Sequence, residues 1–396
     1  MNIWDEIQKN RDRMYQDRRY LHLHPELSHQ EIHTTAFIRQ RLQEFGVEME
    51  ECALQTGVSA IIRGAKPGKT IAIRQDIDAL PILEETELEF ASVHEGVSHA
   101  CGHDLHTAIL LYCAKILQEN REHLAGNVRL LFQPAEETGS GAREMIQAGC
   151  MQREPKADCI VGVHTHPDTP AGKICIRKGP FNAGTDSFKI SIKGKGGHGA
   201  HPYRCIDPVV TAAYVITQLQ TVVSRTNQAV KPVVLSIGSI HGGSAANVIP
   251  DEVVMTGNLR SFYPESREKN MEAIRRIVAG VCEGMGAEGV VEQEGMSLPP
   301  LMNDSAVVDE IIRAASQMIG SENVLEMKLP SPGSDDFSCY LPYCPGAQFF
   351  IGTANEDENS RLGLHSSRVV FDERGMDTGV AVLLQFVWNM LKTSAE

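Results

Sequence analysis

The sequence predicts an α/β fold, in which an α/β/α domain with a mixed sheet is interrupted by an inserted ferredoxin-like β-α-β-β-α-β domain. Two observations carry this prediction. In the first and last parts of the 396-residue chain, short apolar runs alternate with amphipathic helical patterns. In the middle, the order of strand and helix patterns changes to that of a ferredoxin-like sandwich. We therefore expect an interrupted domain at residues 1–184 and 296–396 and an inserted domain at 185–295.

The first part of the chain begins with two helical patterns. An amphipathic pattern over residues 2–22 ends before Pro25, which cannot continue a helix. Ser28, with Glu31 three residues later, predicts a capped start for a second helix that runs to residue 45. Apolar runs further on predict strands over 58–63, 70–74, 127–133 and 158–164, and helices over 107–119 and 142–148.

The inserted domain is predicted from six consecutive patterns. They are a strand at 188–193, a helix at 207–224, strands at 233–240 and 253–262, a helix at 266–285 and a strand at 290–294. The chain then returns to the α/β pattern, with a helix at 306–319, a strand at 347–351 and a closing helix at 372–391. The sequence contains no internal repeat, phosphate loop or dinucleotide fingerprint.

Bulk composition disfavours several classes of function. The length suits two or three domains, and 42% apolar and 22% charged residues are typical of a globular protein. A net charge of −14 argues against a nucleic-acid partner and against an anionic membrane. Residues 1–19 lack the apolar core of a signal peptide, and no run has the length of a membrane span, so we expect a cytoplasmic protein. Most of the ten cysteines fall in apolar runs and should be buried and reduced.

The densest group of reactive side chains is the stretch from His99 to Thr107. It holds one thiol, three imidazoles and a carboxylate around a single glycine, just before a helical pattern. Cys101 and His103 lie two residues apart, and both can turn toward one cation. Histidines at helix starts also arise as caps and surface groups, so this stretch alone leaves both interpretations open.

Further candidate ligands follow buried strands elsewhere in the chain. Glu136 and Glu137 follow one strand, His164 ends another, and His365 comes after the last apolar strand. Strand ends are where open α/β sheets place their chemistry. Without Glu136, the candidates make five protein ligands, which exceed a closed structural zinc site and fall short of two full coordination shells: Cys101, His103, Glu137, His164 and His365. This number favours a pair of divalent ions with open positions for water and substrate.

Two pairs of carboxylates accompany these ligands. Adjacent glutamates are usually a solvated pair, but here they close a strand, so one can bind metal while its neighbour polarises a metal-bound water. Asp76 and Asp78 leave a buried strand, which is costly unless they meet a cation, an imidazole or backbone donors. They either support the metal site or cap a turn.

Three polar features of the inserted domain exceed what a scaffold needs. His198 lies in a glycine-rich loop, Asn247 lies beside a flexible turn, and Arg260 lies within a predicted strand. The planar guanidinium of Arg260 suits a carboxylate. The alternatives are a mobile loop with a surface histidine and an arginine that faces water.

Five motifs resemble, in the same order and nearly end to end, the amidohydrolase branch of the co-catalytic metallopeptidases. This branch includes hippurate hydrolases, N-acyl-amino-acid deacylases and plant indole-acetyl-amino-acid hydrolases. More distant relatives lack the cysteine, and they have His-x-Asp where this chain has Asp-x-Asp, so the resemblance favours N-acyl-amino-acid hydrolysis over dipeptide hydrolysis. The motifs are Arg74-Gln-Asp76-Ile-Asp78-Ala-Leu-Pro81, Cys101-Gly-His103-Asp104, Gln133-Pro-Ala-Glu136-Glu137, Gly196-Gly-His198 and Leu364-His365-Ser.

The resemblance implies a role for each candidate residue. It implies that Glu136 is the general base, while the supporting role of Asp76 and Asp78 rests on their place at the end of a buried strand. It also implies two divalent metal ions per subunit, manganese or zinc first, with cobalt and nickel as alternatives. The implied metal ligands are Cys101, His103, Glu137, His164 and His365.

The resemblance also implies roles for the inserted domain. It would act as a lid and as the dimerisation surface of a homodimer, in which His198 serves the neighbouring subunit as an oxyanion-side donor. Asn247 and Arg260 would bind substrate, with Arg260 on the carboxylate of a small N-acyl amino acid. The implied reaction is the hydrolysis of N-acyl-L-amino acids to a free amino acid and a carboxylic acid. The alternatives are a dipeptidase or exopeptidase, and a metal-stabilised dimer without turnover.

Overall fold

The computed structural model describes residues 2–392, which form two compact units. The first unit comprises the chain up to Gly179, Met302–Leu329 and the chain from Cys339 onward. The second comprises Pro180–Leu301 and Pro330–Ser338. No helix among residues 2–392 has the length and apolar character that crossing a membrane requires.

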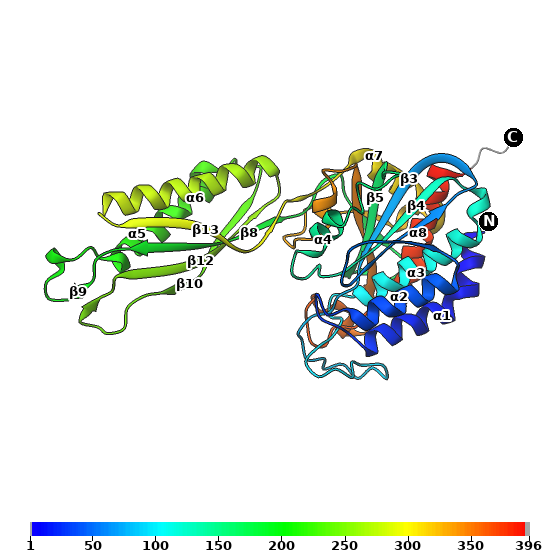
Figure 1. The fold of residues 1–396 in the computed structure, drawn as a ribbon, viewed down its shortest axis with the longest axis horizontal. Coiled ribbons are helices and arrows are strands. Elements are labelled where there is room, and N and C mark those ends of the chain that lie inside the picture. Colours follow the sequence, from blue (N-terminus) through cyan, green and yellow to red (C-terminus); the bar gives the residue numbers. More distant parts are fainter. Residues whose placement is uncertain (1, 393–396) are drawn as a thin grey trace. The chain divides into compact units, whose positions relative to one another are not determined.

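The first unit is built on an eight-stranded mixed sheet, as the sequence predicts (Figure 1). The four central strands β4, β3, β5 and β16 are mutually parallel, whereas β2 and β6 run antiparallel to their central neighbours. The carboxyl ends of the central strands therefore meet at one edge of the sheet. In spatial order the strands are β1 (Glu48–Glu50), β2 (Val58–Arg63), β4 (Ala125–Gln133), β3 (Lys66–Asp76), β5 (Cys159–Pro170), β16 (Gly346–Ala354), β6 (Ile174–Ile176) and β15 (Val324–Glu326).

One face of this sheet carries the main core. Alternate residues of the strands, such as Ile71 and Ile73 of β3 or Val161 and Val163 of β5, share a single buried cluster with helices. Each fully buried aliphatic side chain of this kind contributes about 1.5–3 kcal/mol of transfer free energy. The helices are α1 (Ile3–Leu23), α2 (Ile32–Glu44), α3 (His103–Glu119), α7 (Ser305–Ile319) and α8 (Arg374–Leu391), whereas α4 (Gly141–Gln147) follows β4.

Two helix starts differ from the predictions by more than two residues, and both differences concern the candidate site. The second helix begins at Ile32, and the expected cap at Ser28 is wrong, because both polar residues of that motif make other contacts. Helix α3 begins at His103 rather than 107, after Gly102 in the left-handed region (φ 80°). A Cβ atom at Gly102 would lie 2.7 Å from Cγ2 of Thr165, so this turn requires glycine.

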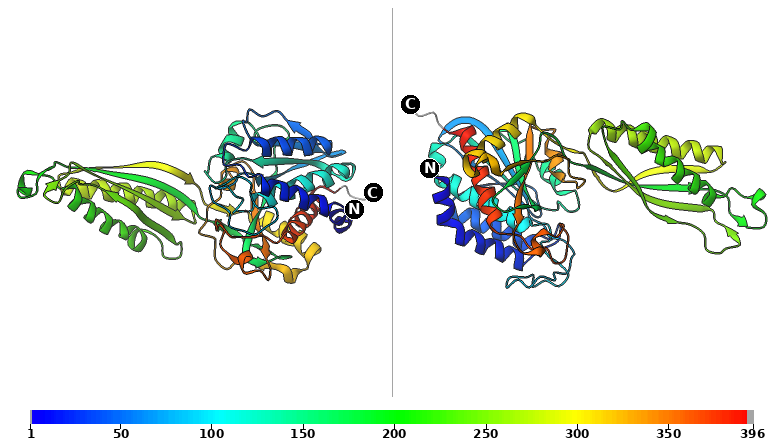
Figure 2. Two further views of the ribbon diagram at one scale, coloured as in Figure 1. Left: turned by 90° about the horizontal axis from the view of Figure 1, so that it is seen from below. Right: turned by 180° about the vertical axis from the view of Figure 1, so that it is seen from behind.

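The second unit has the predicted ferredoxin-like topology. Its sheet has the order β10-β12-β8-β13, with every neighbouring pair antiparallel. Helices α5 and α6 lie on one face of the sheet in each view (Figures 1 and 2), where Phe188, Ile190 and Ile192 of β8 pack into their shared core. The elements are β8 (Gly184–Lys193), α5 (Pro208–Thr221), β10 (Val233–His241), β12 (Glu252–Ser261), α6 (Pro264–Gly284) and β13 (Glu288–Leu298). A two-stranded ladder, β9 (Gly197–His198) with β11 (Val248–Ile249), extends from it.

Candidate metal centre

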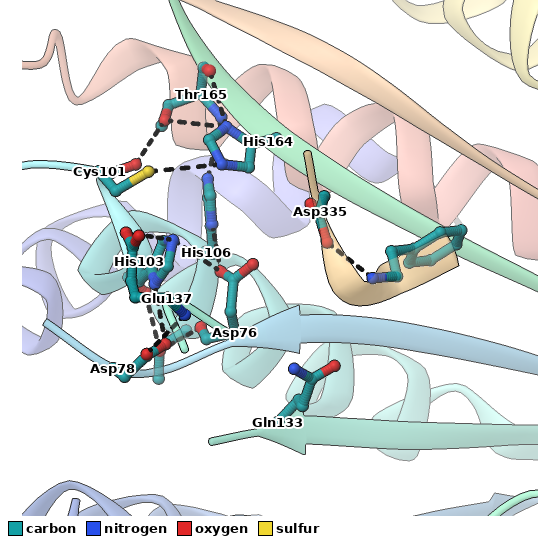
Figure 3. Close-up of polar contacts among 12 residues, drawn as sticks. Asp76, Asp78, Cys101, His103, His106, Gln133, Glu137, His164, Thr165 and Asp335 are labelled. Carbon is teal, nitrogen blue, oxygen red and sulfur yellow. Dashed lines mark hydrogen bonds and ion pairs between the residues drawn. The ribbon is translucent and has the colours of Figure 1, made fainter. Parts of the chain in front are cut away.

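The carboxyl ends of the parallel strands and the start of α3 bring the predicted ligands into one cluster. Figure 3 shows four of them, Cys101, His103, Glu137 and His164. Donor atoms lie within 4.8 Å of one another in each of three overlapping groups. These groups contain all five predicted ligands and the neighbouring Glu136. They are Cys101, His103 and His164; Cys101, Glu137 and His365; and His103, Glu136 and Glu137.

His103 is held by Asp78 and faces the centre of the cluster. Its Nδ1 lies 3.2 Å from Oδ1 of Asp78, which fixes the proton on that nitrogen. Its buried Nε2 has no hydrogen-bond partner and lies 3.8 Å from Oε1 of Glu137, which also has none. Two opposed buried polar atoms without a hydrogen bond are costly, and a cation between them would satisfy both.

The charge around His103 also favours a cation. Burial lowers the pKa of His103, but the carboxylates of Asp76, Asp78 and Glu137 outweigh it and raise the pKa to about 10. A proton therefore occupies the imidazole at neutral pH when nothing else balances these acids. A divalent cation would replace that proton, which is the usual competition at a histidine ligand.

Cys101 and His164 form the second side of the cluster. Sγ of Cys101 lies 3.6 Å from Nε2 of His164, whose Nδ1 donates to the carbonyl oxygen of Thr165 at 2.9 Å. Burial, together with the carboxylates of Glu137 and Glu136, holds the pKa of the Cys101 thiol well above its usual range. Only a bound cation would make a thiolate favourable at this position.

Both ring nitrogens of His106 are hydrogen-bonded to other residues of the chain. Its Nδ1 lies 2.5 Å from Oδ1 of Asp76, and its Nε2 accepts the backbone N–H of Thr165 at 2.9 Å. It therefore supports the cluster by orienting Asp76 and the end of β5. Arg74 contacts the other oxygen of Asp76 at 2.7 Å; burial opposes the charged carboxylate, but His103, His106 and Arg74 together hold its pKa well below the usual value.

The loop that carries Glu136 and Glu137 is held by two buried carboxylates. Ala135 has a left-handed backbone (φ 51°), a conformation costly for any residue with a Cβ. Its N–H donates to Oε1 of Glu31 at 2.8 Å, and the N–H of Glu137 donates to Oδ2 of Asp78 at 3.0 Å. These two bonds keep the adjacent glutamates in fixed and different orientations.

Sequence reasoning missed the roles of Glu31 and Ser28 in this arrangement. Glu31 is fully buried, and Ser28 donates to Oδ2 of Asp78 at 2.7 Å. The Ser-x-x-Glu pattern predicted a local cap, whereas both side chains bond to the ends of other elements. An acidic residue directly before an amphipathic helical pattern was the available signal in the sequence.

His365 reaches the cluster from the loop that follows β16. Its backbone is left-handed (φ 67°), and its N–H donates to the carbonyl oxygen of Ala100 at 3.0 Å. Its Nε2 lies 3.5 Å from Oε1 of Glu137, and half of the side chain is exposed. A strained residue held by such a bond is typical of a functional position.

In the second unit, His198 lies in β9 and pairs with Val248, and Asn247 directly precedes β11. The N–H of Gly199 donates to the carbonyl oxygen of Asn247 at 2.8 Å, and both His198 and Asn247 are exposed. Nδ1 of His198 accepts the N–H of Ala200 at 3.1 Å, which places the ring proton on Nε2. This imidazole is oriented as a donor toward solvent.

Arg260 lies at the opposite end of the same sheet. The β9–β11 ladder adjoins the end at which Glu252 of β12 pairs with Lys193, whereas Arg260 pairs with Thr185 at the other end. At about 3.3 Å per residue, this separates Asn247 from Arg260 by more than ~20 Å. Within one chain, the two predicted substrate-binding residues therefore cannot contact the same small molecule.

Arg260 is also half-buried, and part of its guanidinium is hydrogen-bonded within the second unit. Its Nε donates to Oδ1 of Asn258 at 3.0 Å and its Nη1 to Oγ of Ser334 at 3.1 Å. Burial lowers its pKa below the usual value. These contacts hold the guanidinium in one orientation, as recognition of a carboxylate would require.

Residues 72–389 match the family model described as peptidase family M20/M25/M40. The chain belongs to this family. It is 42% identical to the N-acetylcysteine deacetylase of Bacillus subtilis over 96% of this chain and 97% of that protein. It is 40% identical to thermostable carboxypeptidase 1 of Saccharolobus solfataricus over 95% of this chain and 94% of that protein.

Solved structures share the fold of this chain over nearly its whole length. A Bacillus subtilis protein, described as a dinuclear metal-binding peptidase from the M20 family, superimposes with a TM-score of 0.83. The two chains are 36% identical, and the match covers 97% of this chain and 99% of the other. The expectation of this family and fold is thereby confirmed.

Proposed function

We propose that this protein hydrolyses the amide bond of N-acyl-L-amino acids and releases a free amino acid and a carboxylic acid. The observation that carries the proposal is the position of Glu136, a carboxylate additional to the five candidate ligands and within 4.8 Å of the donor atoms of His103 and Glu137. A structural metal site has no need of this extra acid, but amide hydrolysis needs a base for the attacking water. The similarity to the N-acetylcysteine deacetylase supports the substrate class.

The proposal includes two divalent cations held by Cys101, His103, Glu137, His164 and His365. Nε2 of His103 and Oε1 of Glu137, which are buried and make no hydrogen bond, fit such ions. Bound there, the ions would polarise the amide carbonyl and make water more acidic. Imidazole and carboxylate ligands accept manganese, zinc, cobalt or nickel, and the thiolate of Cys101 favours zinc.

The chain's own residues would carry the proton and hold the substrate. Glu136 takes a proton from the attacking water and returns it to the leaving amine. His198, from the neighbouring subunit of a homodimer built on residues 185–295, donates Nε2–H to the developing oxyanion, a contribution of about 2.7–4 kcal/mol. Arg260 binds the substrate carboxylate, and closure of the inserted domain as a lid excludes water. A cytoplasmic location stays a prediction.

Asp78 supplies a first test of the metal site. Its carboxylate accepts from His103, from Ser28 and from the N–H of Glu137, and an asparagine amide cannot accept at both ends. We expect Asp78→Asn to weaken zinc or manganese affinity by about 10–100-fold, the usual loss when a partner of a ligand is altered. Ser28→Ala, which removes one of the three donors, is the milder control. Equal affinities for Asp78→Asn and the unaltered protein in a competitive chelator titration would contradict the role of Asp78.

Arg260 supplies a test of substrate recognition. Arg260→Ala is expected to raise KM for substrates with a free carboxylate by at least about tenfold, because a bidentate charge-assisted contact is lost. Amidated analogues of the same substrates should be affected little. Arg260→Lys keeps the charge without the planar guanidinium, so its KM should lie between those of the unaltered protein and Arg260→Ala. Equal losses on acids and amides would remove Arg260 from this role.

The similarity to the carboxypeptidase favours one alternative, release of a C-terminal residue from peptides. N-acyl-amino-acid hydrolysis and release of a C-terminal residue both involve a substrate with a free carboxylate beside the scissile bond. The group on the acyl side of that bond, a simple acyl group or a peptide, therefore distinguishes them. Zinc- or manganese-loaded protein should be incubated with acetyl-, benzoyl-, succinyl- and indole-acetyl-amino acids and with peptides that end in the same residue. Release of the amine from the acyl compounds with a higher kcat/KM supports the proposal. Faster cleavage of the peptides would establish the alternative.

A further inference from the structure

Two cysteines that are distant in the sequence lie in contact outside the candidate metal centre. Cys52 follows β1, and Cys150 follows α4. Their Sγ atoms are 3.5 Å apart, and both are free thiols. A disulfide requires a separation of about 2.05 Å, so a small approach of the two sulfurs would suffice.

The two segments that carry these thiols are held together by arginines. Arg129 makes a bidentate contact with Glu50, with both N–O distances 3.0 Å, and its Nη1 donates to the carbonyl oxygens of Arg153 (3.2 Å) and Pro155 (3.0 Å). Arg153 in turn donates to the carbonyl oxygen of Glu51. The two arginines thus connect the segment before Cys52 with the segment after Cys150 and hold the thiols in contact.

The two sulfurs are unequal in a way that suits stepwise oxidation. Cys52 is partly exposed, whereas Cys150 is buried. The hydrogen bond from the Cys150 thiol, helped by the charge of Arg153 and opposed by burial, lowers the pKa of Cys52 to about 6. Thiolates of this kind react first with oxidants. By contrast, burial raises the pKa of both Cys159 and Cys344 to about 12.

We propose that Cys52 and Cys150 form a redox-active dithiol, which hydrogen peroxide converts into an intramolecular disulfide. The Cys52 thiolate attacks one peroxide oxygen and the O–O bond breaks, which leaves a sulfenic acid on Cys52 and hydroxide, protonated to water. The sulfur of Cys150 then attacks the Cys52 sulfur, the S–O bond breaks, and a second water leaves with the thiol proton. The two sulfurs lose two electrons, and the peroxide gains them.

The disulfide would link positions 98 residues apart and join the end of α4 to β1. Helix α4 directly follows the loop that carries Glu136 and Glu137. Oxidation would therefore link the chain that continues from this loop covalently to the sheet. Cross-links that close long loops restrict the unfolded chain most. The oxidised protein is therefore expected to have a higher Tm than the reduced protein.

Peptide mapping of the zinc-loaded protein tests the proposal. After treatment with a small excess of hydrogen peroxide, alkylation in denaturant should label eight cysteines rather than the ten of the reduced chain. Tryptic peptides containing Cys52 and Cys150 should be recovered as one cross-linked species, which dithiothreitol separates. In the native reduced protein, Cys52 should alkylate at least about tenfold faster than Cys159 or Cys344, two buried cysteines with a raised pKa.

Two variants separate the roles of the thiols. Cys150→Ser should accumulate a sulfenic acid on Cys52 that dimedone traps, because the resolving thiol is missing. Cys52→Ser should leave Cys150 reduced under the same conditions, and the turnover and Tm of both variants before oxidation establish that they fold. Failure to recover the cross-link while Cys52 stays alkylatable, or oxidation of Cys159 at the same rate as Cys52, would overturn the proposal.

Discussion

The Glu136→Gln variant is expected to keep its metal ions and to lose turnover by about 10²–10⁴-fold, the usual contribution of a general base. The amide has nearly the shape of the carboxylate, but it cannot take a proton from the attacking water. Glu136 is additional to the five candidate ligands, so metal content should change little. Turnover at saturating substrate and metal content by elemental analysis are the two measurements.

Glu137→Gln is the matched control for this variant. It alters the adjacent residue in the same way, but Oε1 of Glu137 faces Nε2 of His103 and Nε2 of His365. We expect this variant to lose metal, and to regain part of its activity when the metal concentration is raised. Metal loss in Glu136→Gln, with retained metal but lost turnover in Glu137→Gln, would mean that the two roles are reversed.

The places of the longer strands along the chain, and the candidate ligands that follow them, could be predicted from local patterns. Buried strands such as residues 127–133 have a strong apolar signal, and parallel strands place their carboxyl ends together. Glycine and helix signals near Cys101 and His103 gave the start of α3 within four residues. The short strands β1, β6 and β15 were missed, because three residues are too few to show a period.

The contacts that hold the site could not be predicted, because they join residues distant in the sequence. A Ser-x-x-Glu pattern has the same letters whether its side chains cap a helix or reach another strand. Only the fold shows that Glu31 accepts from the N–H of Ala135, 104 residues away, and that burial raises its pKa. The contact between Cys52 and Cys150 was likewise invisible, since neither cysteine has a distinctive local pattern.

Heterodimers of two inactive variants should recover activity if His198 serves the neighbouring subunit. One subunit carries Glu136→Gln with an intact His198, and its partner carries His198→Ala with an intact Glu136. The site of the second subunit then contains its own Glu136 and the imidazole of the first, so one site in two is complete. Heterodimers purified through two different tags should therefore show about half of wild-type turnover. If each chain used its own His198, neither site would be complete and no activity would return.

The geometry of the inserted domain extends this test to the substrate-binding residues. Asn247 lies beside His198 and more than ~20 Å along the sheet from Arg260. Asn247 and Arg260 of one chain must therefore serve different sites if each binds substrate. His198→Ala paired with Asn247→Ala should stay inactive, since both residues would come from the same subunit. His198→Ala paired with Arg260→Ala should regain one complete site, because Arg260 would act within its own chain. The opposite pattern would place Arg260, rather than Asn247, with His198 in the neighbouring subunit's site.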